Sequence, residues 1–156
     1  MIRRNRLLAW AGTLLLAGSA VAAVAAETPR EEVKRLVDEG VALVAQKGLA
    51  GACNVFAQRN SEFWHGDTYV YVINTDKRWV CYPLKPALVG QSPVGLLDTN
   101  GGDTVSDQVK LARSPAGEGW VGYIWPNPAT GKVQDKESFV KLVPGTDLMV
   151  IAGYYK

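Results

Sequence analysis

The sequence lacks most of the residues and motifs from which catalytic and metal sites are built. His65 is the only histidine among the 156 residues, so a metal site with two histidine ligands is excluded. The chain has no Gly-x-Ser-x-Gly nucleophile elbow and no phosphate-binding glycine loop. Nothing in the sequence therefore indicates an enzyme, a cofactor or a bound metal ion.

A basic surface is also missing from most of the chain. The full sequence has 17 Lys and Arg against 15 Asp and Glu, but Arg3, Arg4 and Arg6 precede every acidic residue. From residue 27 onward 14 basic and 15 acidic residues remain, a net charge of −1, and the basic ones are scattered. No nucleic-acid partner is expected, because proteins that bind nucleic acids concentrate positive charge on one face.

The first 26 residues have the pattern of a secretory signal peptide. The basic start is followed by an uncharged run from Leu7 to Ala26 that closes in small residues. We expect cleavage after Ala26, although Ala22 and Ala25 satisfy the same rule. An uncleaved anchor is the alternative, since about 20 apolar residues can just cross a bilayer. We therefore expect a periplasmic or secreted protein with a single domain at 27–156.

Cysteine is almost absent, and its two positions allow two interpretations. Cys53 and Cys81 would both lie in an oxidising compartment, where a disulfide between them is favoured. Such a bond would close a loop of roughly 28 residues and stabilise the fold by about 3 kcal/mol. Two separate buried thiols are the alternative, because a free cysteine packs like a small apolar residue.

A well-formed helix start lies directly after the expected cleavage site. Thr28 is followed by Pro29 and then by Glu31, which is the pattern of a capping box with proline in the first turn. Apolar residues recur at helical spacing over 33–56. We expect one long helix, with Gly48 as the place for a kink, whose apolar face covers a sheet.

The rest of the chain predicts that sheet. Residues 59–67 are expected to be irregular. A loop at 83–102 leads into a short helix capped by Asp103 or Thr104. The fold class is therefore α+β, with a five-stranded antiparallel sheet, the long helix on one face, and a pocket under the loop and short helix on the other. The expected strands, separated by short turns, are 69–74, 79–82, 119–125, 136–143 and 148–154.

Aromatic side chains with polar tips are concentrated in these strands and suit a small-molecule pocket. Strand alternation places Tyr69 and Tyr71 on one face of their strand. It also places Tyr123 and Trp125 on the face opposite Trp120. The pattern does not say which face holds the pocket, and each of these side chains could equally be an ordinary core residue.

The order and spacing of several segments make the chain similar to a known family. They include Asp-Thr-Tyr-Val-Tyr-Val at 67–72 and Gly-Trp-Val-Gly-Tyr-Ile-Trp-Pro-Asn-Pro at 119–128, and the others are 82–83, 88–90, 97–101, Lys136 and 153–155. Together they resemble a single Cache domain (sCache_2-like), a PAS-like extracellular sensor module, in the subtype found as small stand-alone periplasmic proteins. The resemblance implies the PAS-like form of the predicted fold and a pocket whose ligands are typically small organic acids.

The resemblance also assigns roles to individual residues. A lysine that follows the Trp-Pro-Asn-Pro turn, here Lys136, would lie beside the pocket, and Asp98 would help to order the covering loop. On the residues alone, a lysine at this position could equally be exposed. The remaining ligand-binding candidates that the resemblance implies are Tyr71, Tyr82, Trp120, Tyr123 and Trp125.

Three departures from the family pattern concern the ligand. The family usually has an acidic residue where Gly122 stands, a histidine where Tyr82 stands and a tyrosine where Phe139 stands. These changes remove polar groups from the neighbourhood of the expected site. The identity of the ligand therefore cannot be inherited from the resemblance.

The leading hypothesis is an exported, non-catalytic sensor protein that binds a small organic acid. We expect it to pass the signal to another protein, such as a membrane receptor or a histidine kinase, with a homodimer as a further option. One alternative is an amine ligand, since aromatic side chains can also surround a cation. The other is an interaction module with a vestigial pocket, which would use a sheet edge or the long helix.

Overall fold

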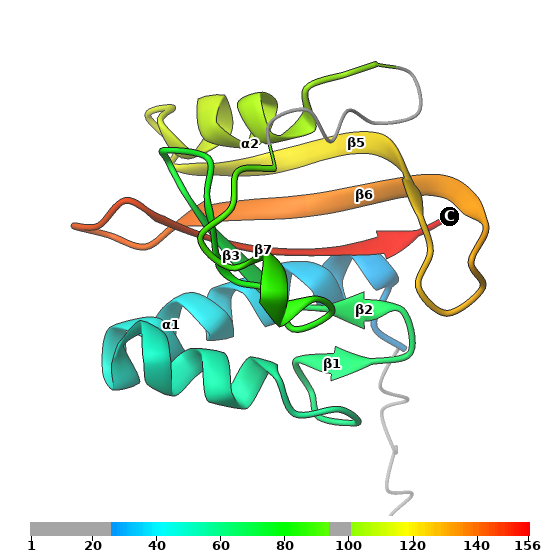
Figure 1. Cartoon of the computed structure of the whole chain (residues 1–156), viewed down its shortest axis with the longest axis horizontal. Helices are drawn as coiled ribbons and strands as arrows, with labels where there is room; N and C mark the ends of the chain where they lie inside the picture. The colour runs from blue at the N-terminus through cyan, green and yellow to red at the C-terminus, as the bar shows by residue number, and fades with distance from the viewer. Residues whose placement is uncertain (1–25, 94–100) are drawn as a thin grey trace, which may run out of the picture.

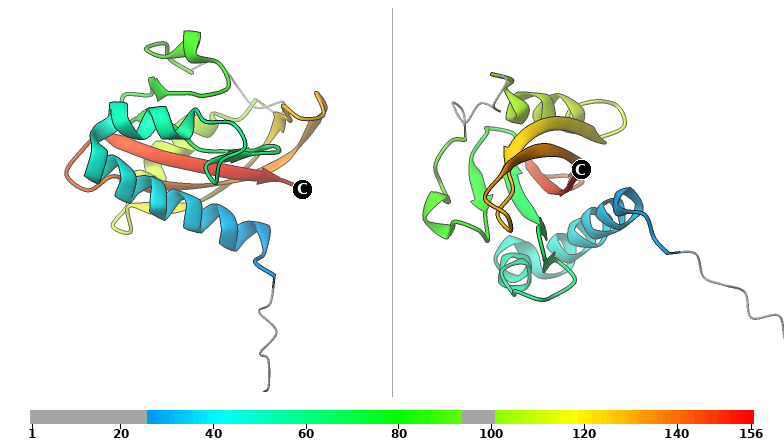
Figure 2. Two further views of the ribbon diagram at one scale, coloured as in Figure 1. Left: turned by 90° about the horizontal axis from the view of Figure 1, so that it is seen from below. Right: turned by 90° about the vertical axis from the view of Figure 1, so that its right-hand side faces the viewer.

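The computed structural model describes residues 26–93 and 101–156 as a sheet with a helix on each face. Figures 1 and 2 show α1 (Pro29–Phe56) and α2 (Thr104–Ala112) on opposite sides of the sheet. The strand order is β4-β3-β7-β6-β5, and all neighbours are antiparallel. The predicted α+β architecture is confirmed. The strands are β3 (Tyr71–Asn74), β4 (Trp79–Cys81), β5 (Glu118–Pro126), β6 (Val133–Leu142) and β7 (Leu148–Tyr155).

Helix α1 begins and bends where the sequence predicts. The Thr28 hydroxyl accepts a hydrogen bond from the Glu31 N–H, and the Glu31 carboxylate accepts one from the Thr28 N–H at 2.9 Å. Gly48 has φ 70° and ψ 169°, a conformation that favours glycine, and it kinks the helix. Within the described ranges, neither helix has the combination of length and apolar character needed to cross a membrane.

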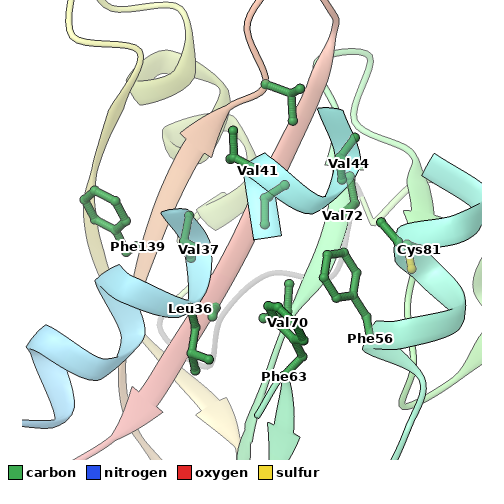
Figure 3. Packing of buried hydrophobic residues seen from close by; sticks show 14 of the residues in the cluster. Leu36, Val37, Val41, Val44, Phe56, Phe63, Val70, Val72, Cys81 and Phe139 are labelled. Carbon is green, nitrogen blue, oxygen red and sulfur yellow. The ribbon is translucent and has the colours of Figure 1, made fainter. Parts of the chain in front are cut away.

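The apolar face of α1 forms the larger core against β3, β6 and β7. Leu36 and Val37 are fully buried and belong to one cluster with Val72 and Phe139, which Figure 3 shows. Phe56, beyond the kink, packs on Phe63 with ring centroids 5.1 Å apart. Each such buried side chain contributes about 1.5–3 kcal/mol. The helix therefore holds the sheet from one side and leaves the other side for α2.

One predicted boundary is wrong. Residues 59–67 were expected to be irregular, but Trp64–His65 forms β1 and pairs with β2 (Thr68–Tyr69) around Gly66, whose φ is 56°. The predicted strand at 69–74 is accordingly divided, with Tyr69 in the small hairpin and Tyr71 at the start of β3. The two-residue turn that starts with glycine is the local signal for this hairpin.

A covalent bond joins α1 to the edge of the sheet. Cys53, in the part of α1 after the kink, is linked to Cys81 of β4, with 5.8 Å between the Cα atoms. The bond encloses the β1–β2 hairpin and β3 within one loop. The disulfide therefore holds the second part of α1 to the edge strand β4 independently of the packing of the core.

Candidate functional site

A cavity lies between the sheet and α2, on the face opposite α1. Its empty space, including the open mouth, is about 360 Å³. None of the described lining residues is charged, and six of them are aromatic. The lining consists of Tyr69, Tyr71, Ile73, Trp79, Tyr82, Pro93, Thr104, Val105, Gln108, Tyr123 and Trp125.

Strand alternation explains which side chains reach the cavity. Tyr71 and Ile73 of β3 belong to the core cluster on the α2 side, whereas Val70 and Val72 belong to the cluster under α1. Successive residues here therefore pack alternately on the α2 side and on the α1 side of the sheet. This settles the question of which sheet face holds the cavity, a question that the sequence pattern leaves open.

Four of the aromatic candidates come together around this space, and one does not. Tyr71, Tyr82, Tyr123 and Trp125 all line the cavity. Trp120 packs on the α1 side instead, with its ring 5.0 Å from that of Phe139 and the Arg30 guanidinium 4.3 Å above it. Its assignment to the pocket is therefore corrected. Trp120 and Tyr123 are three positions apart in β5 (Glu118–Pro126), and strand alternation places residues at an odd separation on opposite faces of the sheet.

The aromatic rings form one continuous wall. Trp79 and Tyr82 stack with centroids 4.0 Å apart and planes 11° apart. The Tyr71 ring lies 5.4 Å from that of Trp79 and 5.9 Å from that of Tyr69. Such pairs contribute about 0.5–1.5 kcal/mol each beyond their buried area, so the ring contacts themselves stabilise the wall.

The polar atoms at the cavity are neutral hydroxyl and amide groups. The Gln108 amide Nε2 donates to the Tyr71 hydroxyl at 3.2 Å, and the hydroxyls of Tyr123 and Ser138 are hydrogen-bonded at 2.9 Å. Burial raises the pKa of Tyr69 and Tyr71 well above the ordinary value of a phenol. These hydroxyls therefore stay protonated and can donate to a ligand.

Lys136 lies behind this wall and is itself buried, with 1% of its surface exposed. It stands opposite Tyr123 in the β5–β6 register. Its Nζ donates to the Tyr69 hydroxyl at 3.2 Å and to the Tyr155 hydroxyl at 3.3 Å, and lies 4.4 and 4.5 Å from the two ring centroids. Within residues 26–93 and 101–156, no carboxylate lies within ion-pairing distance of it.

Burial changes the acidity of this ammonium group. It lowers the pKa of Lys136 to about 7, and the negative charge of Asp67 offsets only part of the effect. A buried cation held by phenol groups alone is destabilised, because phenols replace hydration incompletely. An anion placed beside Nζ would therefore favour the protonated form and be bound by it.

The stability of the unliganded protein should rise between about pH 7 and about pH 10.5 because of this group. Unfolded Lys136 keeps its ordinary pKa of 10.5, so in this window the unfolded state binds more protons than the folded state. Stability then increases with pH, whereas below pH 7 the group is protonated in both states and contributes no slope. Urea unfolding across pH 7–9 measures the slope. This rise of stability with pH should be absent in the variant Lys136→Met. Equal slopes in the two proteins would contradict its assignment to Lys136.

The structure also assigns cavity residues that sequence reasoning missed. Gln108 and Thr104 reach the cavity from α2, and Trp79 reaches it from β4. The signal for Gln108 was present, since it lies at helical spacing from Val105 and Ala112 and is thus a polar residue on the apolar face. Asp98, the candidate for ordering the covering loop, lies outside the described residues.

The described residues contain no candidate metal site. No group of three or more His, Cys, Asp or Glu side chains is placed to hold a metal ion in the part of the chain that the structure describes. His65 instead pairs with Glu32 of α1, with 2.7 Å between Nε2 and Oε1. The cavity beneath α2 is therefore the candidate functional site.

Comparison with known proteins gives a family match and several similar structures. The family model described as Single Cache domain 2 matches residues 27–156. A methyl-accepting chemotaxis protein from Vibrio parahaemolyticus has a TM-score of 0.68 at 17% identity, with 81% of this chain and 87% of that chain covered. At this identity the likeness shows a shared fold.

Two further solved structures are similar over the same part of the chain. One is the periplasmic sensor domain of a chemotaxis protein, with a TM-score of 0.62, 28% identity, and 80% and 88% of the two chains covered. The other is a Cache chemosensory domain that was solved for carboxylic acid recognition, with a TM-score of 0.67, 22% identity, and 80% and 91% covered.

Proposed function

The chain belongs to the single Cache domain 2 family of extracellular and periplasmic sensor modules, and on this premise we propose that it binds a small carboxylate in the cavity beneath α2. The observation that carries the proposal is Lys136, an ammonium group with 1% exposure and no carboxylate partner among the described residues. A bound anion would strongly stabilise the positive charge of a buried cation of this kind.

The surroundings of Lys136 suit a carboxylate in particular. A carboxylate accepts hydrogen bonds through two oxygens and has no donor of its own. The Tyr69 hydroxyl, which lines the cavity, already contacts Nζ, so an oxygen that approaches Tyr69 also approaches the ammonium. Neutral tyrosine hydroxyls on the other side can donate to the second oxygen. The ligand would thus be held by one charge and several neutral donors.

The comparisons support this proposal in its general form. Family members are binding and signalling modules, and one similar structure was solved for carboxylic acid recognition. We propose that this chain likewise captures its ligand without chemical conversion. Residues 1–26 would act as a cleaved signal peptide, and the liganded domain would pass its signal to a partner such as a membrane receptor or histidine kinase.

The proposed function predicts that small carboxylates stabilise residues 27–156 against heat. A ligand at 100 times its Kd stabilises a fold by about 2.7 kcal/mol, which is a shift of several degrees in Tm for a domain of this size. The measurement is thermal unfolding at pH 6.5 with panels of monocarboxylates, dicarboxylates, amino acids and amines.

The panel separates the rival functions. A rise in Tm with amines alone would contradict carboxylate binding and favour an aromatic cage that binds a cation. No shift with any compound would favour the interaction module with a vestigial pocket. The positive charge of Lys136 behind the wall argues against the amine, because it would repel a cation in the cavity.

A further inference from the structure

Helix α2 places a glutamine among the residues that close the cavity. Gln108 lies three residues after Val105 and four before Ala112, on the face that packs against the sheet. It is 1% exposed and lines the cavity. A glutamine at such a position is costly unless both ends of its amide are hydrogen-bonded.

Only one end of this amide has a partner. Nε2 donates to the Tyr71 hydroxyl at 3.2 Å, whereas Oε1 is buried and accepts no hydrogen bond. Among the described residues it is the single buried side-chain oxygen or nitrogen in this condition. An unpaired buried carbonyl that borders a cavity is a site at which a ligand group can donate.

The neighbouring hydroxyls do not hydrogen-bond to this oxygen. The Tyr71 oxygen accepts from Gln108 Nε2 at 3.2 Å, and the Tyr71 hydroxyl also interacts with that of Tyr123. Tyr123 in turn is hydrogen-bonded to Ser138 of β6 at 2.9 Å. These contacts leave Oε1 without a hydrogen-bond partner, in a residue that lines the cavity.

We propose that Gln108 is a specificity-determining residue, which selects small acids that carry a hydrogen-bond donor near the carboxylate, such as 2-hydroxy acids, over acids that carry none. The inference rests on the proposed carboxylate function. The acid group would be bound on the Lys136 side, and the hydroxyl of the ligand would donate to Oε1. A ligand without a donor would leave that carbonyl buried and unpaired, which corresponds to about 5- to 150-fold weaker binding.

Three acids with the same carbon skeleton test the proposal. Calorimetric titration of the purified protein with 2-hydroxypropanoate, propanoate and 2-oxopropanoate compares a donor, no polar group and an acceptor at one position. We expect 2-hydroxypropanoate to bind at least about fivefold more tightly than either of the others. In Gln108→Met, which has nearly the same volume and no carbonyl, propanoate should bind as tightly as the hydroxy acid.

A matched control and the ligand series keep the outcomes distinct. Gln58→Met makes the same change at an exposed position after α1 and should leave the preference intact. Equal binding of the three acids by the unaltered protein, tighter binding of 2-oxopropanoate, or a preference that survives in Gln108→Met would each overturn the inference while the carboxylate function stands. If none of the three acids binds but another acid of the thermal-unfolding panel does, the inference fails and the carboxylate function stands. If no acid of that panel binds, both fail.

Discussion

Replacement of Lys136 by methionine should remove carboxylate binding and raise the stability of the unliganded protein at neutral pH. The methionine side chain is of similar length and fills the same buried space without a charge. Loss of one partner from a desolvated charge pair costs about 2–5 kcal/mol, so affinity should fall by about 30-fold or more. Without a ligand, the variant no longer buries an ammonium that lacks a carboxylate, and we expect a gain of about 1 kcal/mol or more.

Titration and urea unfolding at pH 6.5 measure the two effects separately. Lys132→Met is the matched control, because Lys132 is exposed in the turn between β5 and β6 and its replacement removes the same charge. The control should change neither quantity appreciably. Unchanged carboxylate affinity in Lys136→Met would remove the lysine from the site. A variant that binds poorly and is also much less stable would indicate a structural role instead.

Substitution of Gly153 by alanine should be strongly destabilising. Gly153 lies in β7 opposite Ser138 of β6, near the end of the Lys136 side chain. An added Cβ would approach the Glu137 carbonyl oxygen at 2.6 Å and Lys136 Cε at 2.9 Å, and would clash with the Ser138 hydroxyl. Because the carbonyl is part of the backbone of β6, the strands would have to separate. We expect a loss of about 1–3 kcal/mol, together with weaker ligand binding as Lys136 is displaced.

Gly122→Ala provides the comparison for this substitution. Gly122 is in the middle of β5, it is exposed, and an added Cβ would meet no atom within 4 Å. The same methyl group should therefore leave stability unchanged or raise it slightly, since alanine restricts the unfolded chain. Thermal unfolding of both variants is the measurement. Equal losses of stability would contradict the close approach described for Gly153.

The elements that the sequence predicted well are those with strong local signals. The capping box at Thr28 and the glycine at 48 act through neighbouring residues alone, and both are found in the structure. The hairpin of β1 and β2 was missed because its strands have only two residues each, too few for alternation to be recognised. Its stability comes from tertiary burial of Trp64 and Tyr69 instead.

The kinds of residue that form the candidate site could be predicted from the sequence, but the layer of the fold and the burial of each side chain could not. Period-two alternation groups Tyr123 with Trp125 and places Trp120 on the opposite face, but it cannot say which face holds the cavity. Trp120 was assigned to the cavity by the family resemblance, and the structure places it on the α1 side. The burial of Lys136 depends on Tyr69 and Tyr155, which come from the hairpin and from β7. The orphan carbonyl of Gln108 depends likewise on where α2 lies over the sheet. Such juxtapositions are properties of the assembled fold.

The peptide unit between Lys136 and Glu137 connects the cavity with both ends of the domain. Glu137 points away from Lys136, and its carboxylate accepts hydrogen bonds from Arg30 at 3.0 Å, from Tyr154 at 2.6 Å and from Lys156 at 3.0 Å. Arg30 lies in the first turn of α1, and Lys156 follows β7, at the same end of the sheet (Figure 1). One carboxylate of β6 thus holds the start of the first helix and the end of the last strand together, so a displacement of β6 at this point would act on both attachments at once.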